Sequence, residues 1–152
     1  MCKCDFGQAV TQALGSACCQ SGLQALGSNS SYVSSRNTRN IAGSADIDQC
    51  MKLDAPNAPR WDYAVGYCDD DCRKIFFIEI HSYKIGDLRK KKQWLDAFLQ
   101  GQGKPLRQWA SHSQVAYYWI PTQGAPSKNT PQYRQLRRLG FRIASQVNLQ
   151  CP

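Results

Sequence analysis

The stretch RKIFFIEIHSYKIGD, residues 73–87, places a charged side chain inside an apolar run. Side chains alternate from Ile75 to His81, which predicts a β-strand whose two faces are both largely apolar. A strand of this kind is typical of the centre of a sheet. Glu79, the only glutamate of the chain, lies on one face of it, two residues before His81. An ionised carboxylate is costly to bury unless a cation, a metal or several donors meet it, so a partner for Glu79 is expected.

A second strand is predicted directly upstream, over residues 61–67, WDYAVGY. The short turn CDDDC, residues 68–72, favours an antiparallel hairpin, which brings Asp62 beside Glu79. The small residues Ala64 and Gly66 would leave room for a ligand there. Two carboxylates at an open site suit Mg²⁺ or Mn²⁺, and such a metal can activate water and neutralise charge on a phosphodiester. His81 could act as a ligand or as a proton acceptor.

A helix is predicted over Leu88–Leu99, with Asp87 as its N-cap. Its apolar stripe passes through Lys91 and Lys92, so at least one of these lysines should lean toward the sheet. Either could orient an attacking water or hold a phosphate. The run RKKK, residues 89–92, is equally typical of a solvated helix face.

The remaining pattern predicts a single domain over residues 1–152 with an α/β fold, a mixed central sheet flanked by helices. An N-terminal helix (8–26) and a polar loop (28–40) form its first part, 1–43, and the core follows over 44–152. Further predicted elements are a short helix over Ala45–Leu53 capped by Ser44, a strand Val115–Ile120, a helix that starts at Thr130–Pro131 and ends before Gly140, and a last strand over residues 141–149.

The net charge of +8 is unevenly distributed, because no acidic residue follows Asp96. A basic chain with local carboxylates suits a polyanion held near a cation, which makes nucleic acid the expected partner. A basic surface that serves solubility explains the same charge. The candidate nucleic-acid-binding residues are Arg89, Lys90, Lys92, Arg134, Arg137 and Arg138.

The eight cysteines include no C-x2-C pair, the spacing that signals zinc knuckles. Buried free thiols are therefore expected, with a disulfide between Cys68 and Cys72 across the turn, or a structural metal, as alternatives. No stretch approaches the roughly 18 apolar residues of a membrane span. The first residues lack the apolar region of a secretory signal, so a cytoplasmic setting is expected unless a leader has been removed.

The blocks Pro59-Arg60-Trp61-Asp62 and Glu79-Ile80-His81, followed by a basic helix, resemble the PD-(D/E)XK nuclease-like superfamily. They are also similar to a group of uncharacterised bacterial proteins with RWDY and E-x-H blocks. The resemblance covers roughly residues 44–149 and implies a restriction-endonuclease-like core with Asp62 and Glu79 as metal-binding carboxylates. It also implies an additional acidic residue upstream, for which Asp46 or Asp48 is the candidate. His81 stands where the family has lysine, so Lys91 is the candidate for that role.

These observations lead to a metal-dependent nuclease as the first hypothesis. The alternative is a catalytically inactive nuclease-fold protein that binds nucleic acid or a protein partner, including a second copy of itself. Each site residue also has a structural explanation. Asp62 could pair with Arg60, Glu79 could form a buried ion pair with a lysine, and His81 could be a hydrogen-bonded residue at a strand end.

Overall fold

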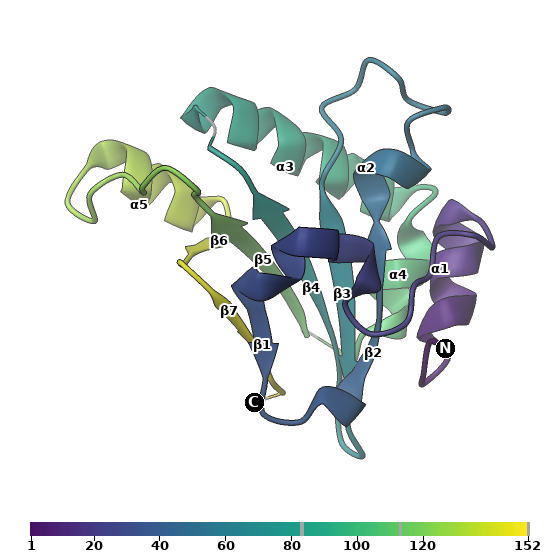
Figure 1. Ribbon diagram of the computed structural model, residues 1–152. Helices are drawn as coiled ribbons and strands as arrows, with labels where there is room; N and C mark the ends of the chain where they lie inside the picture. The colour runs from purple at the N-terminus through teal and green to yellow at the C-terminus, as the bar shows by residue number, and fades with distance from the viewer. Residues whose placement is uncertain (83, 113, 152) are drawn as a thin grey trace.

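A five-stranded mixed sheet forms the centre of the protein (Figure 1); the computed structural model describes residues 1–82, 84–112 and 114–151. The strands lie in the order β2-β3-β4-β5-β6, and only β3 runs against the other four. Their bounds are β2 Ile41–Asp46, β3 Tyr63–Cys68, β4 Arg73–Ile80, β5 Val115–Ile120 and β6 Phe141–Ile143. The predicted α/β class and mixed sheet are therefore confirmed, with β4 as the central strand.

The alternation in β4 divides the core into two layers. Ile75 and Phe77 belong to the hydrophobic cluster that packs under α1 (Phe6–Leu14), α3 (Ile85–Gln100) and α4 (Lys104–Trp109). Phe76 and Ile78 belong to the cluster on the other face. That face is covered by the 3₁₀ helix η1 (Gln24–Tyr32) and by a small parallel sheet of β1 (Val33–Ser35) and β7 (Val147–Leu149).

Two helices lie close to where the sequence predicts them. Leu88, Leu95, Phe98 and Leu99 are buried along α3, which begins three residues earlier than expected because its N-cap is Lys84 rather than Asp87. The helix α5 (Pro131–Arg138) starts as predicted, with Thr130 Oγ1 accepting a hydrogen bond from the backbone N–H of Tyr133. Gly140 follows it with a φ of 91°, a left-handed conformation that favours glycine.

The predicted helix over Ala45–Leu53 is wrong. Residues Ile41–Asp46 form the strand β2, and the helix α2 (Ile47–Cys50) is capped by Asp46, whose carboxylate accepts from the N–H of Gln49 at 3.0 Å. Ser44 is a fully buried strand residue whose Oγ accepts from the N–H of Ala25. The segment IAGSAD shows no alternation because both of its faces are covered, so it lacks the usual signal of a strand.

Other boundaries also differ from the prediction. The region 8–26 contains α1, a turn and the start of η1, while the supposed polar loop contains the rest of η1, β1 and the short 3₁₀ helix η2 (Thr38–Asn40). The single strand expected over 141–149 is β6 and β7, which lie in different sheets. The helix α4 was not predicted.

Four disulfides pair all eight cysteines: Cys2–Cys19, Cys4–Cys68, Cys18–Cys50 and Cys72–Cys151. The expectation of free thiols is wrong, and so is a bond between the two cysteines of the CDDDC turn. These two instead tie the hairpin to opposite ends of the chain. None of the helices in the described residues is long and apolar enough to cross a membrane.

Candidate active site

Three carboxylates gather at one end of the sheet. Asp46 ends β2, Asp62 directly precedes β3, and Glu79 is next to last in β4. Because β3 is antiparallel to its neighbours and Tyr63 pairs with Ile78, Asp62 comes to lie opposite Glu79. The backbone N–H of Asp62 donates to Glu79 Oε1 at 2.8 Å, and that of Ile80 donates to Asp62 Oδ2 at 3.2 Å. The hairpin itself therefore orients both carboxylates.

Lys91 of α3 faces this pair, as the apolar stripe predicted for one of the two lysines. Its Nζ lies 2.9 Å from Glu79 Oε2 and 3.6 Å from Asp62 Oδ1. His81 Nε2 lies 3.3 Å from Asp62 Oδ2, on the other side of that carboxylate. The four residues predicted to carry chemistry, Asp62, Glu79, His81 and Lys91, are thus brought together.

Burial decides the electrostatics of this cluster. Glu79 is 0% exposed and Asp62 6% exposed, whereas the side chain of His81 is 53% exposed. Burial raises the pKa of Glu79 well above its ordinary value, and the nearby Asp62 carboxylate raises it further. Lys91 and the N–H of Asp62 lower it, but not enough to restore the ordinary value. Burial thus outweighs Lys91, and the Glu79 carboxyl holds its proton more readily than an exposed carboxyl does.

Asp46 and Asp48, the two candidates for a further acidic ligand, differ in their surroundings. Asp48 Oδ1 binds Arg60 Nε at 3.0 Å, so Arg60 pairs with Asp48 and not with Asp62 as the structural alternative supposed. Partial burial raises the pKa of Asp46, and Asp48 and Asp62 add to the effect. Asp46 is thus near enough to Asp62 to contribute charge, while Asp48 is engaged in holding the loop that precedes Asp62.

No open space lies beside Ala64 and Gly66, contrary to the prediction. Ala64 is fully buried, and a side chain at Gly66 would come within 2.7 Å of the Phe6 ring of α1. Access to the cluster is therefore expected from the side of His81, its most exposed member. No local pattern indicates that the space beside Gly66 is filled, because the N-terminal helix that fills it is held there by contacts with residues distant in the sequence.

Lys92 does not have the position expected of a nucleic-acid-binding residue. It is 8% exposed, its Nζ lies 2.8 Å from Asp96 Oδ1, and it sits 4.1 Å from the centre of the Tyr117 ring. Arg89 is half-buried and Lys90 exposed on the same helix. The three arginines of α5 named as candidates, Arg134, Arg137 and Arg138, are all exposed.

Two further residues support the site, and of these only Arg60 was considered in the sequence, as a partner for Asp62. Arg60 donates to the backbone carbonyls of Ala55 and Pro56 as well as to Asp48, which fixes the approach to Asp62. Trp119 Nε1 donates to the carbonyl of His81 at 2.9 Å. The position of Arg60, two residues before Asp62, is the only local signal; nothing local links Trp119 to His81.

Within residues 1–82, 84–112 and 114–151, no three His, Cys, Asp or Glu side chains converge as a ready metal centre. Comparison of the chain with protein-family models, curated proteins and solved structures gives no match in any of the three. A functional assignment therefore depends on the geometry of the cluster.

Proposed function

We propose that the protein is a metal-dependent nuclease that hydrolyses phosphodiester bonds in DNA or RNA, with an active site of the PD-(D/E)XK type. The observation that carries this proposal is the contact of Asp62 and Glu79 across a hairpin, with Lys91 Nζ 2.9 Å from Glu79. These are the two carboxylates and the lysine that the sequence resemblance requires. The mixed sheet with flanking helices is compatible with a restriction-endonuclease-like core.

The donor set fits a hard divalent cation, because it consists of carboxylate oxygens. Burial, and after it the nearby Asp62 carboxylate, raises the pKa of Glu79, and a bound divalent cation would favour its ionised form. Asp62 and Glu79 would hold Mg²⁺ or Mn²⁺, with Asp46, at the end of the neighbouring strand β2, as the candidate for a further ligand. When bound, such a metal supplies an activated water and neutralises charge on the phosphate.

The protein's own residues have distinct parts in this proposal. Lys91, held by Glu79, places a cation where it can orient the attacking water or a phosphate oxygen. His81 reaches solvent and contacts Asp62, so it can accept or pass on a proton. Burial of the carboxylates strengthens each of these electrostatic interactions.

The test is cleavage of labelled single-stranded DNA, duplex DNA and RNA with Mg²⁺ or Mn²⁺, wild type beside Glu79→Gln. We expect the variant to lose at least ~100-fold in rate, because an amide keeps the shape of Glu79 but not its charge. Asp96→Asn is the matched control: this half-exposed carboxylate on α3 pairs with Lys92 and should not affect cleavage. Equal cleavage by wild type and Glu79→Gln would contradict the proposal.

One observation favours the alternative of an inactive nuclease-fold protein. His81 replaces the strand lysine, and Lys91 lies against both carboxylates, where it competes with a metal for the same oxygens. That alternative predicts salt-sensitive nucleic-acid binding that survives Glu79→Gln, with no cleavage by either protein.

We also propose that the protein works in an oxidising compartment rather than in the cytoplasm. Four disulfides support this, because such bonds persist in secreted and periplasmic proteins and are rare where thiols are kept reduced. The effect of reduction, predicted below, tests whether the fold requires them.

A further inference from the structure

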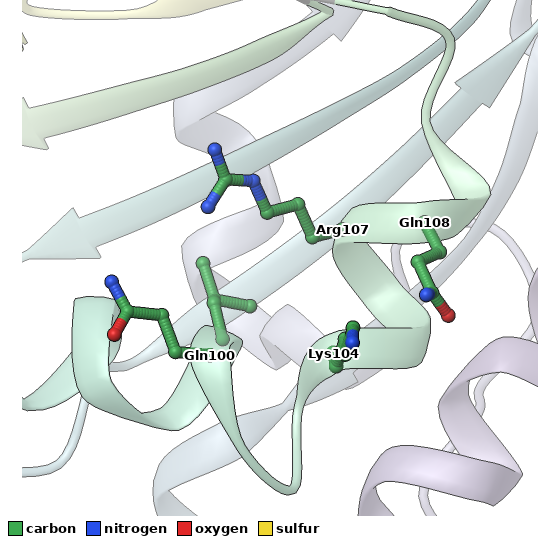
Figure 2. Close-up of a pocket in the computed structure, with 5 residues that line it drawn as sticks. Gln100, Lys104, Arg107 and Gln108 are labelled. Carbon is green, nitrogen blue, oxygen red and sulfur yellow. The ribbon is translucent and has the colours of Figure 1, made fainter.

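A surface hollow of about 440 Å³ lies at the end of α3 away from Glu79. Figure 2 shows Gln100 at the end of α3 and Lys104, Arg107 and Gln108 on α4, around this hollow. Leu99 completes the lining. Among the residues that the structure describes, the hollow thus presents two cations and two amides and no carboxylate.

A second hollow of about 410 Å³ adjoins the first at Arg107, which lines both. Its other named lining residues include His112 and Tyr117 and again no carboxylate. In the described part of the chain neither Lys104 nor Arg107 takes part in an ion pair, and both are exposed. Asp96, the last acidic residue of the sequence, is held by Lys92 on α3.

The spacing along α3 relates this surface to the carboxylate cluster. Lys91 and Leu99, which lines the hollow, are both in α3, and a rise of about 1.5 Å per residue places them roughly 12 Å apart along its axis. A nucleic-acid strand in helical form carries one phosphate per ~3.4 Å, so this length corresponds to about four nucleotides.

We propose that the Lys104–Arg107 hollow binds the phosphate backbone of a nucleic-acid substrate about four nucleotides from the bond cleaved beside Lys91. The inference rests on the proposed nuclease function and adds a binding subsite to it. The planar guanidinium group of Arg107 can donate two parallel hydrogen bonds to one phosphate, and the ammonium group of Lys104 adds a positive charge on a flexible side chain. The amides of Gln100 and Gln108 can donate further hydrogen bonds.

The test measures binding alone, in a Glu79→Gln background that removes cleavage. Fluorescence anisotropy with a labelled single-stranded DNA of about 16 nucleotides compares this protein with its Lys104→Gln/Arg107→Gln derivative. We expect the Lys104→Gln/Arg107→Gln derivative to bind roughly tenfold more weakly than its parent. Because two phosphate contacts are lost, its slope of log affinity against log salt concentration should be shallower by about 1.4. An RNA of equal length, measured in parallel, shows which nucleic acid the hollow prefers.

Arg36→Gln/Arg39→Gln is the matched control, because it removes the same charge from exposed residues in and before η2, which do not line either hollow. It should change affinity less than about twofold. A DNA of about four nucleotides or fewer, too short to contact Lys91 and the hollow at once, should bind the parent protein more weakly than the longer DNA does. Equal losses in the two double variants, or no loss in either, would overturn the proposal.

The outcomes separate this inference from the proposed function. Cleavage that depends on Glu79, together with unchanged binding by the hollow variant, would remove the subsite and leave the nuclease. Loss of binding in the hollow variant, without cleavage by the wild type, would support the surface and remove the nuclease. Thermal melts of both double variants should match that of the Glu79→Gln parent, since all four further substituted side chains are exposed.

Discussion

Two regions of the protein are held in place by different forces. The N-terminal layer, residues 1–24, is tied to itself, to α2 and to the hairpin by the disulfides Cys2–Cys19, Cys18–Cys50 and Cys4–Cys68. The carboxylate–lysine cluster of Asp62, Glu79 and Lys91 contains no covalent link and depends on buried charge. The hairpin thus positions a costly ionic group at one end of the sheet, whereas α1, a short helix, lies in a layer held by three crosslinks.

The weakness of the N-terminal layer follows from its local structure. The helix α1 has nine residues, its N-cap Asp5 makes no side-chain hydrogen bond to it, and Gly15 ends it. Helices this short are marginal without tertiary support. Its burial of Phe6, Ala9, Val10 and Ala13 supplies some of that support. The disulfides supply further stability, because they reduce the conformational entropy of the unfolded chain.

The largest expected effect is the loss of the disulfides. Each native disulfide is worth about 2–5 kcal/mol, so the loss of four approaches or exceeds the total stability of about 5–15 kcal/mol of a typical domain. Incubation with dithiothreitol should therefore unfold the protein or greatly lower its melting temperature. Far-UV circular dichroism measures either change.

Single-bond variants then compare the two ends of the chain. Cys18→Ala/Cys50→Ala should loosen the N-terminal layer, and Cys72→Ala/Cys151→Ala should free the C-terminal end next to β7. Hydrogen exchange should increase in α1 and α2 in the first variant and in β1 and β7 in the second. An unchanged melting temperature after complete reduction would show that non-covalent packing alone holds the layer.

The next effect concerns the cluster. Lys91→Met should destabilise the fold by about 3–5 kcal/mol at neutral pH, because it leaves the fully buried Glu79 and Asp62 without their nearby cation. Lys92→Met, one residue along the same helix, removes a pair with the half-exposed Asp96 and should cost only about 1 kcal/mol. Urea unfolding of both variants measures the difference. Equal losses would mean that the Glu79 contact is not a buried ion pair.

The hairpin and its carboxylate–lysine cluster were predictable because patterns between residues close in the sequence determine their positions. Alternation from Ile75 to His81 gives the strand, a short turn gives its partner, and the register between them sets Asp62 against Glu79. The apolar stripe of α3 then directs a lysine toward the sheet. Each step needs only neighbouring residues.

The N-terminal layer was not predictable by the same rules. Eight cysteines can pair in 105 ways, and each observed bond joins residues at least 17 positions apart. The covering of β2 and the filling of the space beside Gly66 by Phe6 also depend on such distant contacts. Sequence patterns describe a face as buried, but they do not identify the segment that covers it.

The smallest expected effect is a dependence of stability on pH that has an unusual sign. Glu79 of the unfolded chain loses its proton near 4.5, while burial and Asp62 keep its pKa well above that value in the folded protein. Between these two pKa values the folded state binds more protons than the unfolded state. The free energy of unfolding should therefore fall as the pH rises above 4.5, by at most about 1.4 kcal/mol per pH unit from this group.

The difference between wild type and Glu79→Gln isolates this contribution. Asp46 also has a raised pKa and gives a fall of the same sign, but it is present in both proteins. In urea unfolding from about pH 4.5 upward, the stability of wild type relative to the variant should therefore decrease with pH and then level off. A difference that stays constant would mean that Lys91 and the N–H of Asp62 offset the effects of burial and of the Asp62 carboxylate, so that the pKa of Glu79 is the same in the folded and the unfolded protein.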